Sequence, residues 1–541
     1  MRVSRPLASL RHPIHSRGLS TTARYAQRVP VRTEVPLSRN IPQVDYLGGT
    51  AAVASLAMRL VKILVVGGVT VVGVGTVAFE GLHQYIETGP LSIPSRGNDE
   101  YGWEDEVQGW TGGPKGGTDP RLGWKARHAI RAAWMCQSWG AGDASVSSGR
   151  QGFFEPDYFA VRGMIGVDPT IVRPDRGYEM ANAFLTAALD AARAKGLVFP
   201  PALSVLRTPG PPTSQSASAG HSNTSATQGD PAVVDLLLLK AGALERMGSS
   251  DSLSHAKEIY EQVVSAIHSD ADPIHEARIM RLAGKVGSLC ARMGDGDEAL
   301  AWWGWGLSRV GLELPSKTTE VKAELRSWFG KSPAPVEQPT LPTSLPPPIL
   351  RATISLLTTA STHLATRSHI AAASSLQTTA LALLPAPRPI PRADPSTAGM
   401  ILHHTWLEQR SALLTLHLAS TTYAQGRPAV NLATIASARA DQVLEAIEPL
   451  PRVYTRALKP ASQLLRRDAL LTAAEASYTR ALLLERQPEP PLELIAECFE
   501  RSMTLSALES GKTEAKAMGS EWEKYYESFA RVKEKLGQSV E

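Results

Sequence analysis

The longest run of apolar positions lies near the start of the chain, where no charged residue occurs from Ile63 to Phe79. A helix over residues 60–82, with the Lys62 amine reaching outward, would be roughly 33 Å long, enough to cross a bilayer core of about 30 Å. Valine and glycine dominate the run and are poor helix formers in water, so a buried core helix or strand pair is the alternative. Because glycine is common in membrane helices, we expect one transmembrane helix at residues 60–82.

The segment before this run is basic. Residues 1–33 carry arginine, serine and threonine, and the first acidic residue is Glu34. This composition is typical of a mitochondrial transit peptide, with a disordered basic tail as the alternative. The stretch RGLS predicts cleavage after Leu19, and ARYA offers a second site after Tyr25. We therefore expect residues 1–33 to direct the chain to mitochondria.

The charges that flank the apolar run predict its orientation. Arg39, Arg59 and Lys62 lie at its N-terminal side, whereas Glu80 and Glu87 lie at its C-terminal side. The positive-inside rule then keeps the N-terminus in the matrix. The sequence predicts a protein of the mitochondrial inner membrane whose C-terminal body faces the intermembrane space.

Beyond residue 125 the apolar positions recur at helical spacing. In residues 175–195, for example, Ala181, Leu185 and Ala188 form one stripe of alternating small and large side chains. Further helices are predicted at 123–140, 233–247, 400–447 (a pair), 463–509 (a pair) and, as a C-terminal capping helix, from Met518 to Leu536. Residues 88–125 are rich in glycine, proline and tryptophan and read as a loop, and we expect Trp103, Trp110 and Trp124 to fold onto the first helices rather than to anchor the loop on the membrane surface.

One stretch, AGKVGSLCARMGDGDEALAWWGWGL, has a more specific spacing. It places small, bulky, turn, small, aromatic and small residues at intervals that let two short helices pack antiparallel, and these residues are Gly287, Cys290, Gly294, Ala299, Trp303 and Gly306. The spacing resembles the tetratricopeptide repeat (TPR). In this arrangement Trp303 fills the core between the two helices, and Trp302 or Trp305 faces outward as a candidate partner-binding residue.

The predicted fold class is therefore all-α: a TPR-like helical-repeat solenoid that follows one N-terminal transmembrane helix. We expect repeats over residues 126–330 and 349–541, separated by a proline-rich linker at 331–348, with the Gly/Trp-rich loop at 88–125 before them. Loops inserted between repeat helices cost little stability.

Composition and motifs argue against an enzyme. The net charge is only +4 over 541 residues, so no nucleic-acid partner is implied. Cys136, Cys290 and Cys498 are too far apart for a zinc-binding pattern. The glycine-rich GGPKGGT at 112–118 lacks the GK[ST] ending of a phosphate-binding loop, and adjacent histidines at 403–404 have no metal-binding spacing. We expect no catalytic residue, no metal and no cofactor.

The order of elements, together with GSLCARMGDGDEALAWWGWGL, resembles the TPR-containing substrate adaptor of the fungal mitochondrial i-AAA protease. The resemblance implies a non-catalytic role in protein quality control, with the protease complex and its unfolded or membrane-protein substrates as partners. The alternative is an assembly or stability factor for a respiratory-chain complex.

Overall fold

The computed structural model places a defined part of the chain. It describes residues 46–92, 101–103, 106, 111–112, 116–139, 176–201, 211, 229–267, 272–314, 345–385, 397–447, 458–509 and 520–540. The predicted transit peptide, Trp110, Met518 and most of the proline-rich linker lie outside these residues.

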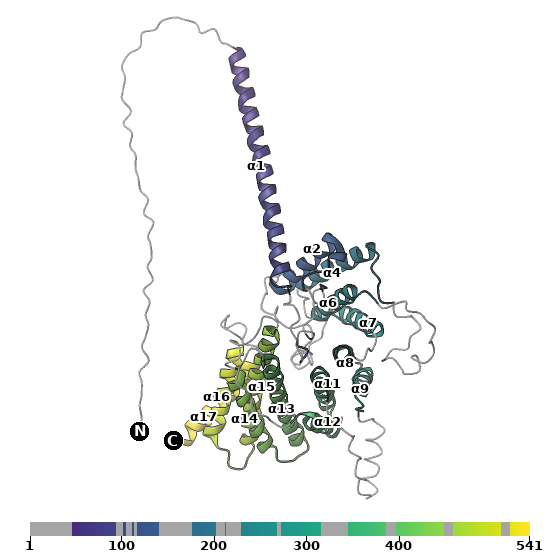
Figure 1. The fold of residues 1–541 in the computed structure, drawn as a ribbon. Helices are drawn as coiled ribbons and strands as arrows, with labels where there is room; N and C mark the ends of the chain where they lie inside the picture. Colours follow the sequence, from purple (N-terminus) through teal and green to yellow (C-terminus); the bar gives the residue numbers. More distant parts are fainter. Residues whose placement is uncertain are drawn as a thin grey trace, which may run out of the picture. The chain divides into compact units, whose positions relative to one another are not determined.

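The described residues form helices and no strands (Figure 1). Their bounds are α1 Tyr46–Thr88, the 3-10 helix η2 Pro120–Leu122, α2 Gly123–Trp139, α4 Arg176–Ala194, α6 Pro231–Met247, α7 Ser250–Ala266, α8 Pro273–Met293, α9 Gly296–Ser308, α11 Pro347–Thr366, α12 Ile370–Leu383, α13 Ala398–Ala424, α14 Val430–Ile447, α15 Lys459–Glu485, α16 Leu492–Glu509 and α17 Ser520–Val540. The all-α class and the helices expected from the apolar spacing are confirmed.

The chain divides into two compact units, with the boundary between residues 76 and 77. The first contains the N-terminal part of α1, and the second contains its last turns and every later helix. In the described part of the chain, no helix meets the length and hydropathy needed to cross a membrane. The predicted span at 60–82 falls within α1, but the side chains of 63–69 and 71–72 lie outside the described residues.

Short polar residues and glycines set the helix boundaries of the second unit. Asp230 and Asp272 each cap the N-terminus of a helix that has proline at its first positions, and each carboxylate accepts a backbone N–H. Gly248 ends α6 and Gly294 ends α8, both in the left-handed conformation that glycine adopts without strain. These local signals separate consecutive helices and let the chain reverse direction between them.

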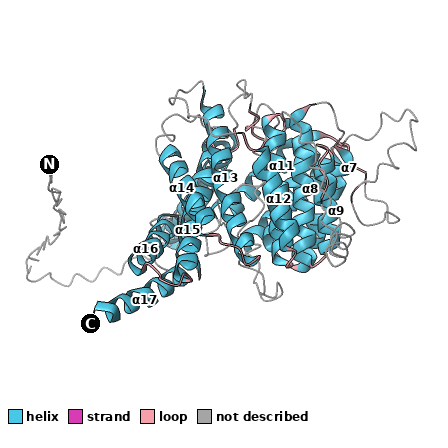
Figure 2. Ribbon diagram, turned by 90° about the horizontal axis from the view of Figure 1, so that it is seen from below, coloured by secondary structure: helices cyan, strands magenta, loops and turns pink. Residues whose placement is uncertain are grey.

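Consecutive helices pack in pairs, and Figure 2 shows this for the helices from α8 onward. The pairs are α2/α4, α6/α7, α8/α9, α11/α12, α13/α14 and α15/α16, and α17 packs on α16. Neighbouring pairs also contact each other, chiefly α4 with α6, α7 and α11 with α8, α12 with α13, and α14 with α15. Each pair therefore buries one side of its neighbour.

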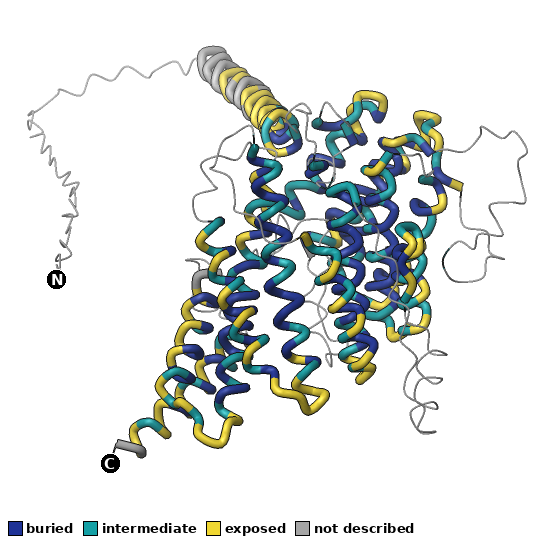
Figure 3. The backbone as a smooth tube through the Cα atoms, turned by 60° about the horizontal axis from the view of Figure 1, so that its bottom comes forward, coloured by how far each residue is buried: buried dark blue, intermediate teal, exposed yellow. Residues whose placement is uncertain are grey.

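The buried side chains form an extended core between the helices. One cluster reaches from Trp103 and α2 to the start of α15, and a second joins α13 to α17. In Figure 3 buried positions follow the sides on which helices meet, and many exposed positions lie on outer faces and at helix ends. Small residues supply much of this contact, since Ala181, Ala256 and Ala360 are each fully buried. Close helix packing of this kind requires small side chains at the points of nearest approach.

Candidate functional site

The residues that the TPR-like spacing singled out lie at the contact between α8 and α9. Gly287 faces Trp303, and the Trp303 indole N–H donates to the backbone carbonyl oxygen of Gly284 at 3.3 Å. Ala299 and Cys290 are fully buried beside them. Gly306 lies against Leu356 of α11, so the same stretch also packs on the next pair.

A methyl group at position 287 has no room. A Cβ there would lie 2.7 Å from Cδ1 of Trp303, closer than real Cβ contacts. We expect Gly287→Ala to lower the free energy of unfolding by about 1 to 3 kcal/mol, because a well-packed core must shift to accept the added carbon. Gly304→Ala in α9 is the matched control, since its Cβ would meet only Leu314 at 3.5 Å, an ordinary contact. Urea unfolding of both variants measures the difference, and equal midpoints would contradict this packing.

The two candidate partner-binding tryptophans differ in exposure. Trp302 is fully buried and its ring meets Trp305 edge to face, with 5.7 Å between centroids. Trp305 is half-buried, and the Arg309 guanidinium lies 5.4 Å from its ring centroid. Trp302 therefore offers no surface to a partner, because its side chain is completely buried. Of the pair, Trp305 is the one with an accessible edge.

A short segment of the Gly/Trp-rich loop is docked on later helices, and we call Tyr101–Trp103 with Glu106 the docked segment. Trp103 is buried, and its indole N–H donates to the Gly399 carbonyl oxygen of α13 at 3.0 Å. Gly102 has φ +66°, and a Cβ there would lie 2.7 Å from Cγ of Pro348. The expectation that these tryptophans fold onto the first helices is wrong for Trp103, which packs on the first helices of later pairs instead. Trp124 is the second residue of α2 and is 68% exposed.

Arg351 of α11 holds the docked segment in place. Its guanidinium donates to a Glu106 carboxylate oxygen and to the Tyr101 carbonyl oxygen, each at 2.6 Å, and lies 3.8 Å from the Trp103 ring centroid. Arg351 is itself buried, so the carboxylate of Glu106 offsets the cost of removing its charge from water. No local sequence motif marks this arrangement, because its members are about 250 residues apart.

His403 of α13 completes the Arg351 contacts. A guanidinium can only donate, so Nδ1 of His403 accepts from Arg351 at 3.0 Å and the imidazole is neutral. Burial, with the adjacent charge of Arg351 and then His404, lowers the pKa of His403 to about 3. The adjacent histidines thus belong to the core and its edge, and among the described residues no group of metal-ligating side chains is close enough to hold an ion.

Acid is expected to weaken the fold through His403. Below pH 6.5, which is about the pKa of a histidine in the unfolded chain, His403 is protonated in the unfolded chain but stays neutral in the folded chain. The free energy of unfolding therefore falls as the pH drops from about 6.5 toward 3. Between pH 7.5 and pH 5 this amounts to up to about 2 kcal/mol. His403→Gln removes the titrating group, and unfolding midpoints across this range should then fall less steeply than for the unchanged chain. Equal slopes would contradict the buried neutral histidine.

The C-terminal turns of α1 are joined to α2 by a half-buried ion cluster. Glu87 accepts from Nε of Arg131 at 2.7 Å, from Arg127 at 3.0 Å and from the Thr118 backbone N–H at 2.8 Å. Burial raises the pKa of Glu87, but these hydrogen bonds outweigh it and hold the pKa below its usual value. Arg131 is only 2% exposed, so the pair fixes the end of α1 against the helical body.

Aromatic and apolar side chains surround this junction on the solvent side. Phe79, Leu82 and Tyr85 of α1 and Trp124 of α2 are all exposed. His128 links the two helices, since its ring stacks on Phe79, meets Trp124 edge to face and contacts Glu80 through Nε2 at 2.9 Å. Exposed aromatic side chains at the end of an apolar helix are typical of residues at a membrane–water interface.

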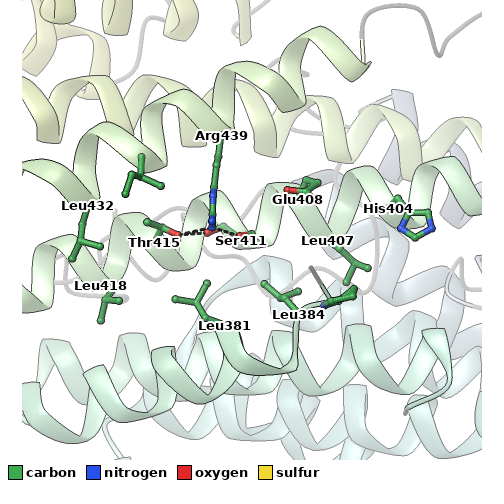
Figure 4. Close-up of a pocket in the computed structure, with 12 residues that line it drawn as sticks. Leu381, Leu384, His404, Leu407, Glu408, Ser411, Thr415, Leu418, Leu432 and Arg439 are labelled. Carbon is green, nitrogen blue, oxygen red and sulfur yellow. Dashed lines mark hydrogen bonds between the residues drawn. The ribbon is translucent and has the colours of Figure 1, made fainter. Parts of the chain in front are cut away.

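An open groove runs along α13 between α12 and α14, with a volume of about 340 Å³ (Figure 4). Its apolar side chains come from all three helices, namely Leu381, Leu384, Pro385, Leu407, Leu418, Leu432 and Ile435. A row of polar residues follows the groove along α13, made of His404, Glu408, Ser411 and Thr415, and Arg439 of α14 lies beside it. Sequence reasoning missed this groove. The spacing of polar residues along α13 was its one signal, and that signal is shared by any solvent-facing helix.

The fold and these sites together define an all-helical protein built from consecutive helix pairs. No known protein family matches the chain, and no curated protein resembles it closely enough to count as a match.

Proposed function

We propose that this protein is a membrane-tethered adaptor of the mitochondrial inner membrane that binds substrate proteins and a membrane AAA protease. In this proposal the helix pairs are a TPR-like solenoid, residues 60–82 cross the membrane, and the body lies in the intermembrane space. The chain carries no reaction of its own.

The observation that carries the proposal is the groove on α13. Stacked helix pairs form a rigid support on which a long surface is left open, and such arrays more often bind partners than catalyse reactions. The groove combines apolar walls with a polar strip, so it can accept apolar side chains while hydrogen-bonding to a peptide backbone.

The junction at Glu87 supports the tether. An anchor is useful to an adaptor only if it positions the binding surface, and the pairing of Glu87 with Arg131 fixes the last turns of α1 to the body. The exposed ring of Trp124 and the exposed Tyr85 suit the headgroup region that the membrane would present at this end of α1.

Affinity purification from mitochondria in mild detergent, read by mass spectrometry, tests the proposal. Recovery of a membrane AAA protease without respiratory subunits is the expected result. Recovery of respiratory subunits alone would favour the alternative, an assembly or stability factor for a respiratory complex. A tagged inner-membrane protein of unrelated fold serves as the control for nonspecific capture.

A further inference from the structure

Arg439 occupies an unusual place in the groove. Its guanidinium donates to the hydroxyl oxygens of Ser411 at 2.5 Å and Thr415 at 3.3 Å, and both partners are neutral. Several half-buried arginines of the described helices have carboxylate partners instead, such as Arg278 with Asp235 and Arg410 with Asp468. Among the described residues no carboxylate forms an ion pair with Arg439, and Glu408 of the same groove attracts it without a hydrogen bond between them.

The groove extends on both sides of this charge. In Figure 4 Leu418 and Leu432 lie on one side of Arg439, and Leu407 lies on the other. The α13 positions that line it run from 404 to 418, a rise of roughly 21 Å. About six residues of extended chain cover that length at 3.3 Å per residue. An extended chain can therefore lie along the groove so that one of its internal residues, and not its terminus, is beside Arg439.

The lining favours a peptide over a lipid. A hydrocarbon chain would take the charged side chains of Arg439 and Glu408 out of water without offering either an ion-pair partner, at a cost in free energy. An extended peptide carries an N–H and a C=O at each residue and can satisfy a polar strip while its apolar side chains meet the leucines.

We infer that this groove binds an extended apolar segment of a partner protein through an internal aspartate or glutamate, whose carboxylate pairs with Arg439. The inference rests on the adaptor function proposed above, because it specifies the chemistry of the segments that the adaptor takes. Ser411 and Thr415 orient the guanidinium, and the carboxylate supplies the ion-pair partner that Arg439 lacks among the described residues. Charge-assisted pairs of arginine with carboxylate are among the stronger hydrogen bonds in proteins.

Glu408 opposes the binding of a carboxylate beside Arg439. It lines the same groove without a hydrogen bond to Arg439, and burial raises its pKa while the attraction of Arg439 partly offsets that rise. When ionised, Glu408 repels an incoming carboxylate. Substitutions of Arg439 and Glu408 should therefore change the affinity for an acidic peptide in opposite directions. A general loss of structure would lower the affinity in both variants.

The test uses the purified full-length chain in lipid nanodiscs and two fluorescent peptides of about nine residues, enough to overhang the groove. Both peptides have blocked ends and leucines around the central position, which is glutamate in one and glutamine in the other. We expect the glutamate peptide to bind about tenfold more tightly. Empty nanodiscs control for partition of the peptides into lipid.

Two variants locate the effect. Arg439→Gln should remove the preference for glutamate while leaving binding of the glutamine peptide unchanged, and Glu408→Gln should strengthen binding of the glutamate peptide several-fold. Far-UV circular dichroism and unfolding midpoints check that both variants remain folded. Equal affinity of the unchanged chain for the two peptides would overturn the inference, as would a preference that persists in Arg439→Gln.

Other occupants give different results. Displacement of the peptide by oleate, with no preference for glutamate, would point to a lipid, and dimerisation lost in Arg439→Gln would point to a second copy of the chain. Either result overturns the inference. If the protease copurifies but the chain binds the two peptides equally, this inference fails and the proposed function stands. If the chain prefers the glutamate peptide but no protease copurifies, the inference about the groove stands and the proposed function fails.

Discussion

Trp303→Ala is expected to lower the free energy of unfolding by about 3 to 5 kcal/mol, the usual cost of truncating a buried aromatic side chain. Trp303 is 1% exposed, and it fills the space that Gly287 leaves between α8 and α9. The variant also removes the indole donor to Gly284 and the ring contact with His363 of α11, whose centroid lies 5.2 Å away. The damage should therefore reach the neighbouring pair.

Urea unfolding followed by circular dichroism measures this loss, and hydrogen exchange of α8, α9 and α11 amides shows where it falls. Trp124→Ala is the control, since that ring is largely exposed and its truncation should change stability by no more than about 0.5 kcal/mol. Unchanged unfolding of Trp303→Ala together with lost partner binding would instead make Trp303 a contact residue.

Glu87→Gln is expected to lower stability by about 3 to 5 kcal/mol, because removing one member of a buried ion pair leaves the other charge uncompensated. Arg131 would remain buried without a carboxylate, and the single amide oxygen of glutamine could not accept all the hydrogen bonds that Arg131, Arg127 and Thr118 now donate to two oxygens. The last turns of α1 should then detach from α2 before the remaining helices unfold.

Limited proteolysis between α1 and α2, with the overall unfolding midpoint, measures this effect. Glu80→Gln on the same helix is the matched control: its carboxylate is half-exposed and pairs with His128, so its loss should change little. The double variant Glu87→Leu/Arg131→Met should be more stable than Glu87→Gln, since no charge is left buried. Equal cleavage of Glu80→Gln and Glu87→Gln would contradict the role given to Glu87.

The helices could be predicted from the sequence because their signals are local. Ala181, Leu185 and Ala188 repeat at the helical period, and all three are fully buried in α4. The same holds for Ala256, Tyr260 and Val263 of α7. A glycine such as Gly294 marks a helix end through its own backbone preference, without reference to distant residues.

The sites could not be predicted in this way because their members come from distant positions. Arg351 contacts Tyr101 and Glu106 although three helix pairs, α2/α4, α6/α7 and α8/α9, lie between them in the sequence. The spacing indicated that Trp303 fills the repeat core, but it did not indicate that the adjacent Trp302 is fully buried as well. Arg439 looks like any surface arginine of α14 until α13 places two hydroxyls beneath it.

We propose that one N-terminal helix holds the helical body at the outer face of the mitochondrial inner membrane. Protease treatment of intact mitochondria and of mitoplasts, followed with an antibody against residues 520–540, tests it most directly. The account predicts that this C-terminal epitope is protected in intact mitochondria and digested once the outer membrane is ruptured. An epitope that survives in mitoplasts until detergent is added would place the body in the matrix and contradict the account.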